Sequence, residues 1–125
     1  MRHLLHNKST APFLLLLLLA VSAPLASAHS HPVSMEPAAN ATTPAPKKVI
    51  MHFSEDLEPK FSSITVSNEA GRVVNKEASV VSSTDAKLMA VTLPPLPAGV
   101  YTVHWVAVAV DSHRTQGTYN FTVKE

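Results

Sequence analysis

Two histidines, His29 and His31, stand one residue apart directly behind the apolar N-terminal part of the chain. The preceding residues have a positively charged start, an apolar stretch at 11–20 and the small-x-small sequence Ala26-Ser27-Ala28, which together are typical of a secretory signal peptide. The apolar stretch is shorter than the roughly 20 residues that a membrane-spanning helix needs. We therefore predict that residues 1–28 are a cleaved signal peptide and that the mature chain begins with the α-amine of His29.

A chain that begins with His29 could bind one metal ion in either of two ways. The α-amine and Nδ1 of His29 could close a chelate ring, and an amine with a pKa of about 7.7–8.0 gives up its proton to a metal at small cost. Alternatively, the amine, two backbone amides and the imidazole of His31 could surround copper or nickel in a plane. Both arrangements are rich in nitrogen and tetragonal, which suits Cu(II). The plain alternative is a frayed chain end whose histidines bind nothing.

A second group, Asp111-Ser112-His113, stands at the end of the longest predicted strand, 100–110. In an extended segment, residues i and i+2 project to the same side about 6.6 Å apart, so one metal ion or one hydrogen bond could engage both side chains. The alternative is a surface turn in which Asp111 caps the backbone and His113 is solvated. We expect His52 and His104, which lie within strand-like segments, to be packed or partly exposed strand residues and not ligands.

The remaining residues 29–125 have about the length of one domain. Without Arg2 and Lys8 the net charge is about −1, which argues against partners such as nucleic acid or an anionic membrane surface, and no second apolar span would hold the mature chain in a membrane. The chain has no cysteine, so a metal site must use histidine, carboxylate, methionine or backbone donors.

Several short segments alternate between apolar and polar residues with a period of two, and after residue 28 no convincing helical period occurs. In 48–53, this alternation places Val49, Met51 and Phe53 on one face. The run 100–110 is apolar on both faces over much of its length, which predicts a central strand covered on both sides. The predicted strands are 48–53, 61–67, 72–74, 87–93, 100–110 and 117–123, with 37–47 as an extended proline-rich connector. Such spacing predicts an all-β sandwich or barrel.

At this point the chain resembles the CopC-type periplasmic copper-binding proteins over essentially its whole mature length. The resemblance rests on the histidine behind the signal, on the segments 52–61, 96–105 and 110–123, and on the spacing of Trp105, Asp111, His113 and Gly117. It implies a Greek-key β-sandwich related to cupredoxins and immunoglobulin-like domains. It also implies a Cu(II) site in which His29 binds through its amine and imidazole, and Asp111 and His113 bind through their side chains.

The resemblance further implies copper binding and delivery in the periplasm, in concert with a membrane partner of the CopD type. His31 matches a second histidine that many members carry, and we include it among the candidate metal ligands. Some members have a methionine-rich loop that binds Cu(I), whereas residues 68–82 here contain no methionine. Because Cu(I) prefers soft thioether ligands, this difference argues against a separate Cu(I) site.

The sequence therefore predicts an exported Cu(II) carrier or buffer that is not an enzyme. Two alternatives from other classes stay open. A small copper-dependent oxidative enzyme could use the same N-terminal histidine chelate, and a β-sandwich could serve as an interaction module without any metal.

Overall fold

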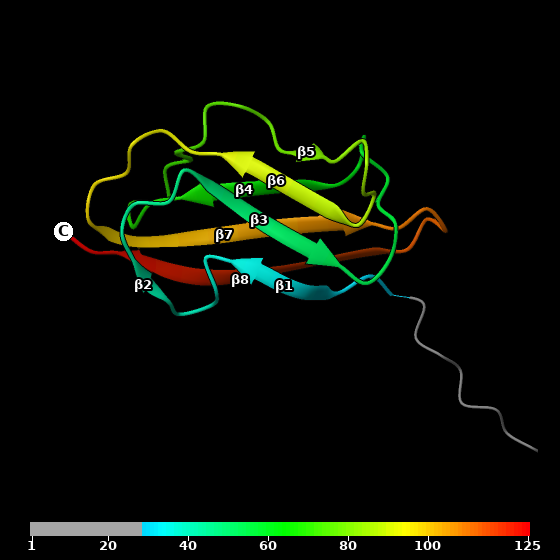
Figure 1. The fold of residues 1–125 in the computed structure, drawn as a ribbon, viewed down its shortest axis with the longest axis horizontal. Helices are drawn as coiled ribbons and strands as arrows, with labels where there is room; N and C mark the ends of the chain where they lie inside the picture. Colours follow the sequence, from blue (N-terminus) through cyan, green and yellow to red (C-terminus); the bar gives the residue numbers. More distant parts are fainter. Residues whose placement is uncertain (1–28) are drawn as a thin grey trace, which may run out of the picture.

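The computed structural model describes residues 29–125, which form two four-stranded sheets packed face to face (Figure 1). The predicted signal peptide, residues 1–28, lies outside the described residues. One sheet has the order β1-β3-β6-β5 and the other β2-β8-β7-β4. The strands are β1 (Pro32–Glu36), β2 (Thr42–Thr43), β3 (Lys48–Phe53), β4 (Ser63–Ser67), β5 (Val80–Val81), β6 (Leu88–Thr92), β7 (Gly99–Val108) and β8 (Arg114–Val123). The predicted all-β sandwich is confirmed.

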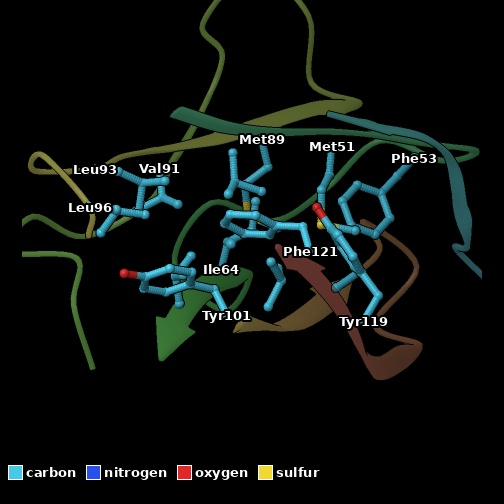
Figure 2. Packing of buried hydrophobic residues seen from close by; sticks show 14 of the residues in the cluster. Met51, Phe53, Ile64, Met89, Val91, Leu93, Leu96, Tyr101, Tyr119 and Phe121 are labelled. Atoms are coloured by element: carbon cyan, nitrogen blue, oxygen red, sulfur yellow. The ribbon is translucent and has the colours of Figure 1, made fainter. Parts of the chain in front are cut away.

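The core lies between the two sheets, where the period-two alternation places it. Val49, Met51 and Phe53 of β3 are buried, and the first two lie opposite Val91 and Met89 of the neighbouring strand β6. Alternate residues of the second sheet meet them from the other side, as Figure 2 shows for Ile64, Tyr101, Tyr119 and Phe121. The predicted inward face of 48–53 is therefore confirmed.

β7, which covers most of the longest predicted strand, differs from its prediction. It lies in the middle of its sheet, between β8 and β4, but only one of its faces is buried. Tyr101, Val103 and Ala107 point into the core, whereas His104 is exposed and Val100 keeps 38% of its surface exposed. The expectation of cover on both faces is wrong because a sandwich has only two layers, so each sheet turns one face to solvent.

The N-terminal part of the described chain forms a strand that its residue pattern does not reveal. β1 pairs antiparallel with β3 and carries an irregularity in register between Pro32 and Ser34. The predicted connector 37–47 contains β2, a two-residue strand parallel to β8. The predicted strand 72–74 is reduced to one isolated bridge between Ser67 and Val73. Such short strands form because a neighbouring strand is available for pairing, and the apolar–polar pattern within two or three residues is too short to reveal them.

One close contact joins the two longest strands. Trp105 and Gly117 are register partners on β7 and β8, and the indole ring lies where a side chain at residue 117 would stand. A Cβ at that position would lie 2.7 Å from Cζ2 of Trp105. The ring also packs edge to face on Phe53, with ring centres 5.5 Å apart. Glycine at residue 117 thus makes room for the aromatic pair that joins the two sheets.

Over residues 29–125 no helix has the length and apolar character of a membrane span.

Candidate metal centre

Asp111, Ser112 and His113 lie in the tight turn that joins β7 to β8. The amide of Ser112 donates to the carbonyl of Ala109 at 2.8 Å, and Ser112 has a φ of 78°. Of the two geometries considered for this segment, the surface turn is the one observed, since the chain reverses direction here. The turn also places the side chains of Asp111 and His113 side by side.

The carboxylate of Asp111 is bonded to His113 twice. One oxygen accepts the backbone amide of His113 at 3.1 Å, and the other lies 3.0 Å from its Nδ1. The two interpretations of the sequence are thus combined, because Asp111 caps the turn and also engages the imidazole. The side-chain hydrogen bond to His113, followed by the backbone one, holds the pKa of Asp111 below its usual value. When His113 donates from Nδ1, its Nε2 lone pair is the one available to a ligand or metal.

His29 comes from the other end of the described chain and meets His113. Their ring centres are 5.0 Å apart, with the planes inclined at 70°. In Figure 1 the start of the described chain lies at the same end of the sandwich as the turn between β7 and β8. Both rings are exposed to solvent, so an incoming ion could reach them. Three predicted ligands, His29, Asp111 and His113, are therefore brought together by the fold.

Residues 29–31, which we call the N-terminal arm, are held by hydrogen bonds to both sheets. The hydroxyl of Thr115, on β8, donates to the carbonyl of Ser30 at 2.7 Å, and Ser30 is only 1% exposed. Ser54, which directly follows β3, donates its amide to the carbonyl of His31 at 2.9 Å and accepts the amide of His31 at 3.1 Å through Oγ. Sequence reasoning missed Thr115 and Ser54. The only indication of Thr115 in the sequence is its place two residues after His113, and Ser54 has none, because it lies far from His31 along the chain.

The fourth candidate, His31, turns its ring toward the arm itself. Its Nδ1 lies 3.1 Å from the hydroxyl of Ser54 and 3.4 Å from the carbonyl of His29. The remaining histidines belong to other surfaces. His52 pairs with Asp85 at 3.3 Å, and His104 lies on the exposed face of β7 between register partners Thr65 and Thr118.

The donor atoms of the site are nitrogen and oxygen, as a tetragonal Cu(II) site needs. In the part of the chain that the structure describes, no three histidine or carboxylate side chains already converge on one point at metal-binding distances. One reason is that Nδ1 of His113 and a carboxylate oxygen of Asp111 are bonded to each other. A metal that uses this oxygen would exchange that hydrogen bond for a coordination bond. The residues thus fit a copper ion in donor type and in proximity.

Comparison with known proteins agrees with this picture. The family model of the CopC domain matches residues 27–124. Copper resistance protein C of Escherichia coli is 40% identical over 107 residues, covering 79% of this chain and 84% of that protein. Two solved structures are also similar. The CopC crystal structure from Methylosinus trichosporium OB3b has a TM-score of 0.72 and 30% identity, covering 77% of this chain and 94% of that one. PcoC, a methionine-rich copper resistance protein from Escherichia coli, has a TM-score of 0.66 and 37% identity over 78% of this chain and all of the other.

The match of the family model covers the β-sandwich and both halves of the candidate metal centre, the N-terminal arm and the turn between β7 and β8. The resemblance of the sequence to this family is confirmed. The chain belongs to the CopC family.

Proposed function

We propose that the processed chain is an exported, non-enzymatic Cu(II)-binding protein that carries or buffers copper in the periplasm. The observation that carries this proposal is the approach of the His29 and His113 rings to 5.0 Å, with Asp111 hydrogen-bonded to His113. The names of the relatives, copper resistance proteins, support copper as the ion. A CopD-type membrane protein is the partner we propose for delivery.

In the proposed site, His29 binds through its α-amine and imidazole, His113 through its imidazole, and Asp111 through the carboxylate oxygen that faces His113. Processing after Ala28 creates the amine, so the ligand exists only in the mature protein. This requirement distinguishes the proposed site from an ordinary pair of surface histidines. An exposed site with nitrogen and oxygen donors suits reversible loading of Cu(II).

The competing mode, in which His29, Ser30 and His31 alone surround the ion, is less compatible with the arm. That mode uses the amide nitrogen and Nδ1 of His31, and both lie within hydrogen-bonding distance of Ser54. It also uses the amide of Ser30, a buried residue. Because these contacts would have to break, we propose that His31 supports the arm and that the copper ligands are completed by Asp111 and His113.

The test compares two purified forms of the protein that differ by one residue. One begins at His29, and the other keeps Ala28 in front of it, which moves the amine out of the chelate ring. We expect the longer form to bind Cu(II) much more weakly in a competition titration, with a changed electron paramagnetic resonance spectrum. A control variant, His31→Ala with the native start, should retain most of the affinity.

Equal affinity of the two forms would overturn the N-terminal model. If the form beginning at His29 bound no Cu(II) above background, the alternative of a metal-free interaction module would be supported instead. Copper-dependent consumption of oxygen and reductant on a polysaccharide would support the oxidative enzyme. These three results contradict different parts of the proposal, so one set of preparations separates them.

A further inference from the structure

We propose that Thr115 and Ser54 are positioning residues of the copper site, which hold the N-terminal arm across the open end of the sandwich so that His29 meets His113. The part of the inference that concerns copper affinity rests on the proposed function. Its structural part, the hydrogen bonding of the arm, concerns the metal-free protein and can be tested there separately.

Thr115 connects the arm to the strand that carries His113. It stands two residues after His113, and its side chain belongs to the inward-facing, half-buried set of β8. Its hydroxyl donates to the carbonyl of Ser30 at 2.7 Å. Since Ser30 is 1% exposed, water cannot readily replace this partner, and a buried carbonyl without a donor is costly. One strand thus supplies both the ligand His113 and the hydroxyl that places the opposite ligand beside it.

Ser54 connects the arm to the other sheet. Its amide and hydroxyl bond the carbonyl and amide of His31, which prolongs the pairing of β1 and β3 by one step. The backbone supplies only the bond from the amide of Ser54 to the carbonyl of His31. The next residues add little, because Pro32 has no amide hydrogen and the register of β1 is irregular just beyond it. The side chain of Ser54 therefore supplies the bond that the backbone lacks.

The two contacts act on neighbouring residues of the arm from opposite sides. With Ser30 bonded to β8 and His31 bonded beyond β3, the direction in which His29 leaves the sandwich is determined before any metal arrives. A ligand that is already in place loses less conformational freedom on binding, and this raises affinity without adding a contact to the ion. Removing either hydroxyl should then weaken copper binding while leaving the set of ligands the same.

The experiment uses the protein that begins at His29, with Thr115→Val and Ser54→Ala as test variants. Thr118→Val and Ser63→Ala are matched controls, since both residues are exposed and their register partners, His104 and Val106, lie outside the arm and the turn. Each test variant loses one hydrogen bond of ordinary strength, so each should bind Cu(II) roughly three- to tenfold more weakly. The electron paramagnetic resonance spectrum should stay as in the wild type, which a change of ligands would alter.

The metal-free protein provides the second measurement. The amide of His31 should exchange with solvent faster in Ser54→Ala than in the wild type, because its acceptor is gone, and the controls should not change it. Thr115→Ser keeps the hydroxyl and should restore the affinity lost in Thr115→Val, which separates the hydrogen bond from a general loss of folding.

Three outcomes would contradict the inference. Thr115→Val and Ser54→Ala could bind as tightly as the wild type, or the exchange of His31 could be the same in all variants. Ser54→Ala could also bind more tightly with a new spectrum, which would mean that releasing His31 favours the tripeptide mode. By contrast, a wild-type protein that binds no Cu(II) would contradict the proposed function, and the exchange measurement would still test the arm.

Discussion

Replacing Gly117 by alanine tests whether the space beneath Trp105 stabilises the hairpin that carries Asp111 and His113. The new Cβ would lie 2.7 Å from Cζ2, 2.9 Å from Cε2 and 3.0 Å from Nε1 of the indole. These distances are too short for carbon against an aromatic ring, so the ring must move. It is restrained from moving by Phe53, whose ring packs against it edge to face.

Two opposing effects determine the expected magnitude. Overpacking of a well-filled site costs about 1–3 kcal/mol. Alanine also restricts the unfolded chain relative to glycine, which returns about 0.5–1 kcal/mol. The steric cost is the larger effect because the clash falls on a rigid ring, so we expect Gly117→Ala to lower the free energy of unfolding by about 1–2 kcal/mol.

Urea unfolding followed by circular dichroism and by the emission of Trp105, the single tryptophan of the chain, measures this loss. With a urea dependence of about 1.5 kcal/mol per molar, the midpoint should fall by roughly 1 M. Thr118→Ala, at the next and exposed position of β8, is the control. In a Trp105→Leu background the cost of Gly117→Ala should shrink, because the smaller side chain leaves room. A Gly117→Ala protein as stable as the wild type would refute the steric argument.

Three further predictions concern the site and the core. His113→Ala should weaken Cu(II) binding much more than His104→Ala, which removes an exposed histidine of β7 outside the site; equal losses in a competition titration would place the ligand elsewhere. In the metal-free protein the pKa of the Asp111 carboxyl should lie below the ordinary value of 3.8. The ionised carboxylate therefore stabilises the folded state at neutral pH, and this contribution is lost as the pH falls through the lowered pKa. An NMR titration of that carboxyl with a midpoint at or above 3.8 would contradict the two hydrogen bonds to His113. Burial raises the pKa of Tyr119 to about 12 from 10.0. The folded state should therefore lose about 2 kcal/mol of stability as the pH rises from 10 to 12, whereas Tyr119→Phe should lose less over the same range in urea unfolding.

The faces of the main strands could be predicted from residue order alone. In β3, alternation from Val49 to Phe53 specifies the buried side wherever the strand lies, because successive side chains of a strand point to opposite faces. The same rule is less decisive for β7, where the solvent-facing set contains Val106 and Val108 as well as Thr102 and His104. Which set is buried there depends on the second sheet, and that sheet is built from segments distant in sequence.

The chemistry of the candidate site was also readable from residue types. His29, His31 and the Asp-x-His pair, in a chain without cysteine, indicate nitrogen and oxygen donors, which is the donor set that we propose for Cu(II). Spacing along the chain, however, does not indicate the distance between His29 and His113, and it left both an extended segment and a surface turn open for the residues around Asp111.

Only the tertiary structure decided how these donors meet. Closure of the sandwich brings the start of β1 to the turn between β7 and β8, and Thr115 and Ser54 then hold the N-terminal arm there. Local alternation is encoded by neighbouring residues, whereas this arrangement depends on strand order and on single hydrogen bonds between residues far apart in sequence. The sequence itself therefore determined which donor atoms are available, and the packing of two sheets determined that they lie close together.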